Sequence, residues 1–280
     1  MFEWNHIRSL LFVPAGKLGK WEKAIDAGAD AICIDLEDSV PPKEKDSARS
    51  EVMTFLNALG DDRVKIVLRI NSPESDTGKS DIEMLASLIL LPDALMIPKL
   101  DSEDPLIKLG NKLISNGISL PFMPLIETAD ALYSARSILS NEMVKGAVFG
   151  GHDLAMQLGC TKEWDVLSTY RSEFIKAAGG LNLSLIDMPW FGLENESGLK
   201  NETENAKRYG FTAKAAIHPN QVKTINTVFT PTDSEIEEAN EMIQVFKESK
   251  GHAVAWKGKV LEPPIINQAK RIVERARNLS

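Results

Sequence analysis

Two short apolar stretches of this chain each end in a carboxylate, and that combination indicates metal chemistry. Residues 123–126 run into Glu127, and residues 147–151 run into Asp153. Apolar runs of this length bounded by Gly and Pro are typical of buried strands. In a parallel α/β fold the carboxyl ends of successive strands open onto one ligand site. A pair of carboxylates with water is how proteins bind Mg²⁺. The alternative is that both positions cap the helices that follow, because Thr128 and Asp153 are acceptable N-cap residues.

Composition excludes several classes of function. The 280 residues are 43% hydrophobic and 26% charged, which is ordinary for a globular protein. The formal net charge of −8 argues against nucleic acid or an anionic membrane as the main partner. The longest apolar runs are far too short to span a bilayer, and the first residues lack the features of a secretion signal. Two cysteines, Cys33 and Cys160, indicate neither a disulfide framework nor a zinc site, so we expect a cytoplasmic protein.

The carboxylates belong to a regular alternation of strand-like and helical segments. Most strand-like runs are rich in Ile, Leu and Val without polar alternation, as in strands buried on both faces of a parallel sheet. Strand-like runs occupy residues 8–14, 31–38, 65–71, 94–100, 120–127, 146–153, 183–188 and 213–219. Helical spacing occurs at residues 20–25, 82–89, 130–139 and 170–181. Eight such units in about 220 residues predict an α/β fold of the (β/α)₈ TIM-barrel type. A doubly wound open sheet is the alternative.

The last fifth of the chain has a different pattern. A helical segment at residues 233–250 is followed by a Gly-containing basic stretch and a final helix at residues 265–277. We therefore expect a catalytic barrel at residues 1–230. Residues 231–280 would form a C-terminal helical segment and tail, which we expect to contact a neighbouring subunit.

Polar residues gather at the predicted strand ends. Besides Glu127 and Asp153, the ends carry Lys17, Glu37 and Asp38, Arg69 and Asn71, Lys99, and His218. In a barrel, residues at the carboxyl ends of the strands surround one pocket. So many ionisable groups at the same end of the strands predict a functional site.

These motifs resemble the citrate lyase β-subunit and malyl-CoA lyase family, within the HpcH/HpaI aldolase superfamily. Two of the matching pieces are Asp35-Leu36-Glu37-Asp38-Ser39-Val40 and Gly150-Gly151-His152-Asp153-Leu154. The others are residues 8–14, 68–71, 97–99, 126–128 and 210–221, with a weaker match at 258–269. They run in the family's order over residues 8 to 225, which makes the family resemblance strong.

The resemblance implies a mechanism as well as a fold. Glu127 and Asp153 would bind Mg²⁺, with Glu37 and Asp38 hydrogen-bonding the waters of the metal. Arg69 would hold a substrate carboxylate through its two-pronged guanidinium. Backbone N–H groups near Gly151 would add further donors. A 3-hydroxyacyl-CoA would be cleaved to acetyl-CoA and a 2-keto acid.

Other readings of these residues stay open. Arg69 could instead form a structural salt bridge with Glu37 or Asp38. Lys99 and Lys214 are expected either to contact the substrate or CoA phosphates, or to pair with acids of the barrel. Lys17 suits an anionic cofactor if the first loop faces it. His152 stands where an acidic or polar residue is more usual, and it is placed with the substrate-binding residues without a defined role.

The C-terminal tail departs from the family's pattern. Members that cleave CoA esters often carry an Asp in a Gly-x-Met-x-Asp-x-Pro-like tail, which is thought to protonate the enolate from a neighbouring subunit. Here the stretch is Gly258-Lys259-Val260-Leu261-Glu262-Pro263-Pro264. Glu262 keeps the acid but is one methylene longer, which moves the proton donor by about 1 Å and lowers the rate about a hundredfold unless the backbone compensates. The resemblance also implies a homo-oligomer, a trimer or a multiple of one.

Four functions are compatible with this sequence. The first is a Mg²⁺-dependent lyase acting on citramalyl-, malyl- or citryl-CoA. The second is a citrate lyase β subunit acting on a thioester of an acyl carrier protein. The third is a thioesterase for the same CoA esters, and the fourth is a non-catalytic binding protein. Residues 189–191 could form an apolar wall for a methyl group, which favours citramalyl-CoA.

Overall fold

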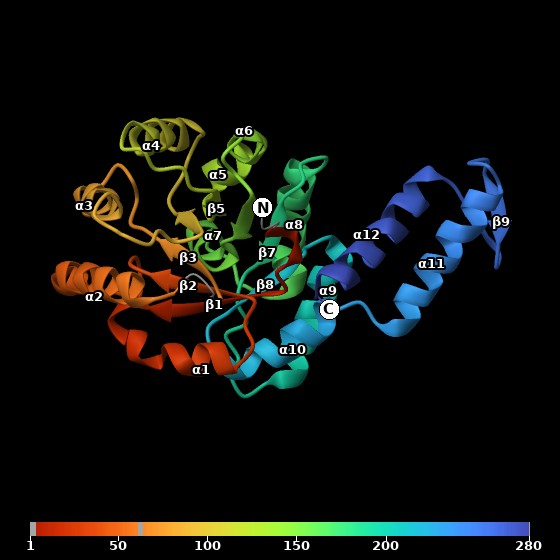
Figure 1. Ribbon diagram of the computed structural model, residues 1–280, viewed down its shortest axis with the longest axis horizontal. Coiled ribbons are helices and arrows are strands. Elements are labelled where there is room, and N and C mark those ends of the chain that lie inside the picture. The colour runs from red at the N-terminus through yellow and green to blue at the C-terminus, as the bar shows by residue number, and fades with distance from the viewer. Residues whose placement is uncertain (1–3, 61–63, 280) are drawn as a thin grey trace. The chain divides into compact units, whose positions relative to one another are not determined.

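The computed structural model of the chain describes residues 4–60 and 64–279, and these form a closed barrel followed by a helical segment (Figure 1). Eight parallel strands pair in chain order and β8 closes onto β1. The strands are β1 (Ser9–Pro14), β2 (Ala31–Asp35), β3 (Lys65–Arg69), β4 (Ala94–Ile97), β5 (Phe122–Ile126), β6 (Gly146–Phe149), β7 (Ser184–Asp187) and β8 (Ala213–Ala216). The predicted α/β TIM barrel is confirmed.

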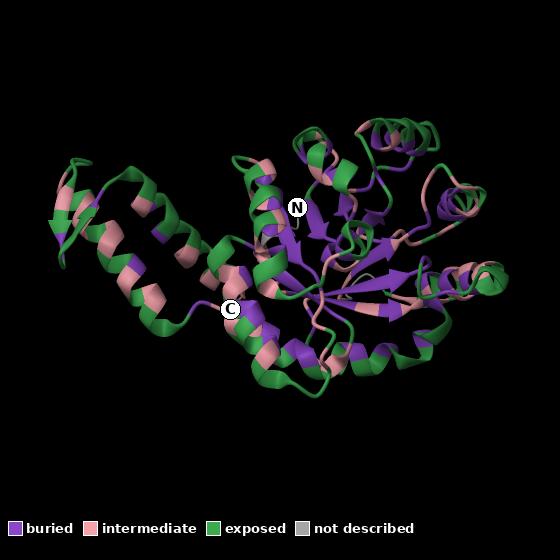
Figure 2. Cartoon of the chain, turned by 180° about the vertical axis from the view of Figure 1, so that it is seen from behind, coloured by how far each residue is buried: buried purple, intermediate pink, exposed green. Residues whose placement is uncertain are grey.

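Helices follow the strands and surround them. They are α1 (Trp21–Asp26), α2 (Lys45–Ala58), α3 (Asp76–Leu85), α4 (Asp104–Ser115), α5 (Ala129–Tyr133), α6 (Ala135–Ser140), α7 (Gly151–Leu158), α8 (Trp164–Ala178), α9 (Glu196–Tyr209) and α10 (Pro219–Phe229). Short 3₁₀ turns occur at η1 (Trp4–His6), η2 (Ala15–Lys20) and η3 (Pro42–Glu44). The strands are buried almost throughout, purple in Figure 2, because the helices cover the outside of the barrel and side chains fill the inside.

The structure corrects several predicted boundaries. Residues 150–153 do not extend the sixth strand: β6 ends at Phe149, and α7 starts at Gly151. Similarly, β2 ends at Asp35, so Glu37 and Asp38 lie in the loop beyond it. Residues 130–139 form parts of α5 and α6, two short helices. Ile89, expected in a helix, follows the end of α3 and is 87% exposed.

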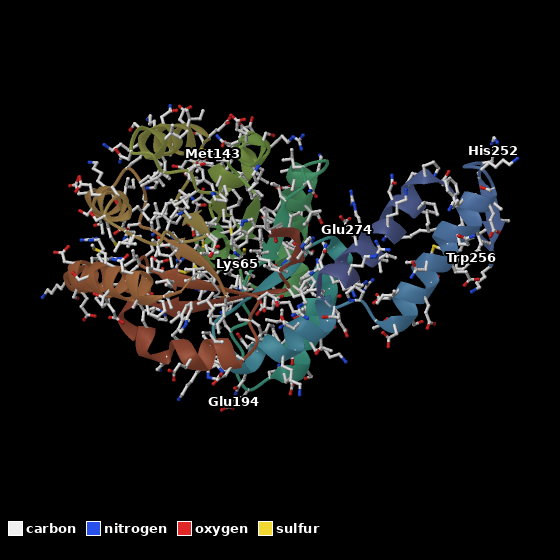
Figure 3. All side chains as sticks on the ribbon, in the orientation of Figure 1. Lys65, Met143, Glu194, His252, Trp256 and Glu274 are labelled. Carbon is white, nitrogen blue, oxygen red and sulfur yellow. The ribbon has the colours of Figure 1, made fainter. Side chains whose placement is uncertain are left out.

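Contacts divide the chain into two units, one up to Asn226 and one from Thr227 onward. The second unit contains α11 (Asp233–Glu248), a hairpin of β9 (Val254–Trp256) and β10 (Lys259–Leu261), and α12 (Pro263–Leu279). The hairpin lies in the Gly-containing basic stretch, where no strand was predicted. Trp256, labelled in Figure 3, anchors it, since its Nε1 donates to Glu241 of α11 at 3.2 Å. α11 begins with a capping box formed by Thr232 and Glu235.

In the part of the chain that the structure describes, no helix combines the length and the apolar character needed to cross a membrane.

Candidate active site

A cavity of about 470 Å³ opens at the carboxyl ends of the barrel strands. Its lining combines polar and apolar side chains. Its polar lining residues are Asp35, Asp38, Ser39, Arg69, His152 and Asp153. Its apolar lining residues are Phe12, Pro14, Leu125, Val148, Phe149, Gly150, Met188, Pro189, Phe191 and Ile217. Two acids expected at this site, Glu37 and Glu127, are not among the lining residues. Each is buried next to a lining residue, Glu37 next to Asp38 in the sequence and Glu127 against Gly150.

Glu127 directly follows β5 and is only 3% exposed. Its Oε1 accepts a hydrogen bond of 2.7 Å from the backbone N–H of Lys99, whereas Oε2 is buried without a hydrogen-bond partner among the described residues. Lys99 has φ of +55°, a left-handed conformation that is uncommon for a residue other than glycine. A buried carboxylate oxygen without a donor is costly, which indicates that a ligand completes this site.

Gly150 connects the two predicted metal ligands. A Cβ at Gly150 would lie 2.4 Å from Cβ and 3.0 Å from Cα of Glu127, so a larger residue does not fit there. Gly150 is also the N-cap of α7, and Asp153 lies exposed in the first turn of that helix. The capping alternative is right for Thr128, whose Oγ1 caps α5 and accepts from the Ala131 N–H, and wrong for Asp153, because the N-cap of α7 is Gly150.

The electrostatics at Glu127 favour a bound cation. Burial raises the pKa of Glu127 to about 8, and the negative charges of Glu37 and Asp153 act in the same direction against the Lys99 hydrogen bond and Arg69. A divalent cation would reverse this balance by neutralising the acids together. The oxygen-only donor set and the buried Oε2 therefore fit Mg²⁺, with water as the remaining ligands. Within residues 4–60 and 64–279, no group of three or more His, Cys, Asp or Glu is arranged to enclose a metal.

Arg69 ends β3, and its guanidinium holds the acids of the second loop. Its Nε and Nη2 donate to the two oxygens of Asp35 at 2.7 Å each, and Nη1 lies 3.0 Å from Glu37 Oε2. Nη1 is 3.8 Å from Asp38. The expected structural salt bridge therefore exists, but its main partner is Asp35, which the sequence reading did not select. The strand register contains the missed signal, because Asp35 and Arg69 are paired residues at the ends of β2 and β3.

Glu37 and Asp38 have different environments. Glu37 is buried, and its Oε1 lies 2.6 Å from Lys99 Nζ. Burial raises the pKa of Glu37 more than Arg69 and Lys99 lower it. The side chain of Asp38 is 52% exposed and lies 3.4 Å from the same ammonium. Of these two loop residues, therefore, Glu37 is buried and Asp38 is half-exposed.

A buried polar cluster fixes the backbone that carries Glu37. Lys45 Nζ donates to the carbonyl oxygens of Leu36 and Glu37 at 2.7 and 2.6 Å, and to Asn71 Oδ1 at 2.8 Å. The backbone and side-chain N–H groups of Asn71 donate to Asp81, which is fully buried. The residues after Arg69 therefore position the loop after β2.

The expected substrate-binding residues fall into three groups. His152 lines the cavity, and Gly151 is buried at the start of α7, where a Cβ would lie 2.6 Å from Met188 Sδ. Lys99 and Lys214 both pair with acids, which is the second reading the sequence left open. Lys214 is fully buried, with its ammonium 2.6 Å from Asp187, 2.8 Å from Glu202 and 2.7 Å from the Met188 carbonyl oxygen, so it is not available to CoA phosphates.

Two further expected residues lie apart from these contacts. Lys17 is exposed in η2, directly after β1. Glu262 is exposed in the second unit, between β10 and the start of α12. The role of each stays a prediction.

Comparison with known proteins now gives the family. Residues 8–219 match the family model described as HpcH/HpaI aldolase/citrate lyase. Residues 162–279 match one described as a carbon–carbon bond lyase of the TIM-barrel fold. Together with the barrel and its acidic cavity, these matches define the class: the chain belongs to the HpcH/HpaI aldolase/citrate lyase family.

Individual relatives span almost the whole chain. A (3S)-malyl-CoA thioesterase of Cereibacter sphaeroides is 32% identical over 96% of this chain and 94% of its own. The mitochondrial citramalyl-CoA lyase of Mus musculus is 29% identical over 97% of this chain and 86% of its own. The structure of CitE from Mycobacterium tuberculosis in complex with magnesium, acetoacetate and coenzyme A has a TM-score of 0.81 and 26% identity, covering 96% of this chain and 97% of that one. The relatives thus include both a CoA-ester lyase and a thioesterase.

Proposed function

We propose that this protein is a Mg²⁺-dependent carbon–carbon lyase that cleaves a 3-hydroxyacyl-CoA of the citramalyl, malyl or citryl type to acetyl-CoA and a 2-keto acid. The observation that supports it most directly is the buried Glu127 carboxylate with one oxygen unpartnered, close enough to Asp153 and Glu37 for their charges to raise its pKa. This is the donor set of a hard cation, at the mouth of a barrel in this family.

In this proposal Glu127 and Asp153 hold Mg²⁺. When bound, the ion would supply Lewis-acid stabilisation of the oxygen that becomes negative as the carbon–carbon bond breaks. Lys99 keeps Glu127 in place through its backbone N–H, and Glu37 is held between Lys99 and Arg69.

The chain's own donors would bind the carboxylate of the substrate. Asp35 holds the Nε–Nη2 edge of Arg69 and Glu37 lies beside Nη1, so the guanidinium is a fixed positive charge in the lining of the cavity. α7 begins without a side-chain cap, and its first N–H groups, from Gly151 to Asp153, have no partner within the helix. These groups carry partial positive charge and suit an anionic ligand.

A product assay by mass spectrometry tests the proposal. Purified protein with Mg²⁺ receives malyl-, citramalyl- and citryl-CoA in separate reactions. We expect acetyl-CoA and a keto acid from at least one substrate, and loss of turnover in Glu127→Gln. The matched control is Glu173→Gln, which removes an exposed carboxylate on α8 and should retain activity. If Glu127→Gln turned over as well as the wild type, the proposed metal site would be wrong.

A thioesterase is the second candidate, and a specific observation favours it: the relative at 32% identity is a malyl-CoA thioesterase. Hydrolysis would require a positioned water in addition to the same metal site. Free CoA with an intact hydroxy acid in the assay above would identify this activity. No turnover of any CoA ester would favour a subunit that acts on a carrier-protein thioester, or a binding protein.

We also propose that the protein is a homo-oligomer in which Glu262 of one subunit serves a neighbour's site. The exposure of Glu262 is compatible with this role. Light scattering tests it, since a fully active monomer would contradict a shared site.

A further inference from the structure

The loop between β7 and α9 is folded around the indole of Trp190. Trp190 Nε1 donates to the Gly192 carbonyl oxygen at 2.7 Å. A Cβ added at Gly192 would lie 2.8 Å from Nε1, and one added at Gly198 would lie 2.6 Å from Cζ2 of the same indole. Real Cβ atoms do not approach so closely, so the indole occupies space that both glycines leave open. The loop is therefore a packed structure.

This loop gives the cavity most of one wall. Met188, Pro189 and Phe191 line the cavity, whereas Trp190 is not among the lining residues. The expectation that residues 189–191 form an apolar wall therefore fits Pro189 and Phe191, with Trp190 as their anchor. The Phe191 ring lies 4.8 Å from the His152 ring, centroid to centroid, which joins the wall to the start of α7.

One buried side chain connects this loop with the next loop of the barrel. Gln221, in the first turn of α10, is only 3% exposed. Its Nε2 donates to the Trp190 carbonyl oxygen at 2.7 Å. Its Oε1 accepts from the Ile217 N–H at 2.9 Å and from the His218 N–H at 3.3 Å. Because Ile217 also lines the cavity, the length of the Gln221 amide sets the spacing of two cavity-lining loops.

The chemistry of the lining residues indicates which part of a substrate meets this wall. Arg69 and Asp153 are charged lining residues and suit the carboxylate and the hydroxyl of a hydroxy acid. The Met188, Pro189, Phe191 and Ile217 side chains carry no charge themselves, and Lys162 Nζ lies over the Phe191 ring at 4.2 Å from its centroid. An apolar substituent on the hydroxyl-bearing carbon would instead gain from burial there.

We propose that Gln221 is a positioning residue that sets the acyl specificity of the cavity, by holding the wall at the spacing that suits a methyl group on the hydroxyl-bearing carbon. The substrate class is then a 3-methyl-3-hydroxyacyl thioester such as citramalyl-CoA. This inference rests on the proposed lyase or thioesterase function. It adds which residue distinguishes substrates that differ by one methyl group.

Two variants disturb the wall from different ends. Gln221→Glu keeps an acceptor for the Ile217 and His218 N–H groups but places a carboxylate oxygen against the Trp190 carbonyl, which breaks the link between the loops. Gly198→Ala displaces the Trp190 indole without altering Gln221. The control is Thr224→Val, because Thr224 also lies on α10 and bonds Glu196 at the start of α9, away from the cavity-lining residues.

The measurement is the ratio of kcat/KM for citramalyl-CoA to that for malyl-CoA. In the wild type we expect this ratio to exceed about 10, the usual discrimination for one methyl in an apolar pocket. It should fall about tenfold in Gln221→Glu and in Gly198→Ala, and stay within about twofold of the wild type in Thr224→Val. Mg²⁺ affinity should be unchanged in all three. Hydrogen exchange of the amides of Met188 and of residues 190–193 should accelerate in the first two variants, because their anchor is lost.

Each outcome decides the inference. If Gln221 had only a structural role, the variants would have a lower melting temperature and an unchanged kcat/KM ratio. If the wall contacted the pantetheine arm, kcat/KM would fall equally for both esters. Either result overturns the proposal. If Gln221→Glu does not fold, Gly198→Ala alone decides. If the wild type cleaves neither ester by either route, the proposed function has failed first and the specificity role fails with it. If the wild type cleaves both and shows no preference, only the specificity role is wrong.

Discussion

Replacing Gly150 by Ala would test whether the closest packing in the site controls the metal ligand. The added Cβ would lie 2.4 Å from Glu127 Cβ and 3.0 Å from its Cα, where ordinary contact begins at 3.4 Å. Glu127 must therefore move by about 1 Å, and it is buried with little free space. The same shift would lengthen or break the 2.7 Å hydrogen bond from the Lys99 N–H.

The expected effects follow from that displacement. A misplacement of about 1 Å at a reacting centre lowers a rate about a hundredfold. Mg²⁺ affinity should fall at least about tenfold, the smaller of the effects seen when the support of a metal ligand is removed. Forcing a methyl into a packed site should lower the free energy of unfolding by about 1 to 3 kcal/mol. The barrel should still fold with that loss.

Calorimetric titration of metal-free protein with Mg²⁺ measures the affinity, and the mass-spectrometric product assay measures the rate. Gly16→Ala is the matched control, because Gly16 also follows a barrel strand and a Cβ there would meet nothing within 4 Å. A folded Gly150→Ala protein with Mg²⁺ affinity within twofold of the wild type would refute the argument that Gly150 positions Glu127.

Three other predictions concern charge. Lys214→Met should lower the free energy of unfolding, measured in urea, by about 3–5 kcal/mol, because the buried acids Asp187 and Glu202 each lose a partner. The control Lys200→Met, on the surface of α9, should change it by less than about 0.5 kcal/mol. Burial raises the pKa of Asp187, but Lys214 and Arg171 lower it further, so that the net shift is downward. The ionised Asp187 should therefore stabilise the fold fully above about pH 4, and this stabilisation should disappear as the pH falls through the lowered pKa. A free energy of unfolding that does not change with pH in this acid range would contradict the prediction. Glu262→Gln should abolish turnover and leave Mg²⁺ binding intact; unchanged activity would remove Glu262 from the mechanism.

The barrel was predictable because its signal is local. Each strand is a short apolar run, and eight of them recur at regular spacing, so strand burial on both faces determines the fold. Boundaries were less predictable. The run that includes Gly150 and Gly151 looks like the end of a strand, but the chain turns into α7 there, and periodicity over four residues does not distinguish these states.

The side chains that do chemistry were also more predictable than those that position them. Glu127 and Asp153 follow apolar runs, so their place at the barrel mouth can be inferred from the order of elements. The pairing of Asp35 with Arg69 was missed because Asp35 directly follows the apolar part of its strand and looks like one more acid of the motif at residues 35–40. Gln221 forms hydrogen bonds with two loops, and its partner Trp190 is 31 residues away in the sequence. No local sequence pattern predicts a contact over that separation.

Lys99 shows why the residue type alone does not predict which residues position the acids of the site. Its left-handed backbone costs about 1–2 kcal/mol for a residue with a Cβ, and glycine would avoid that cost. Glycine would keep the N–H that holds Glu127 but would remove the ammonium that lies 2.6 Å from Glu37. A lysine in this strained conformation therefore supports two acids from different loops, one through its backbone and one through its side chain. The strain persists because the contact with Glu37 requires a lysine and the contact with Glu127 requires the backbone in this place, and only the folded barrel brings the two acids within reach of one residue.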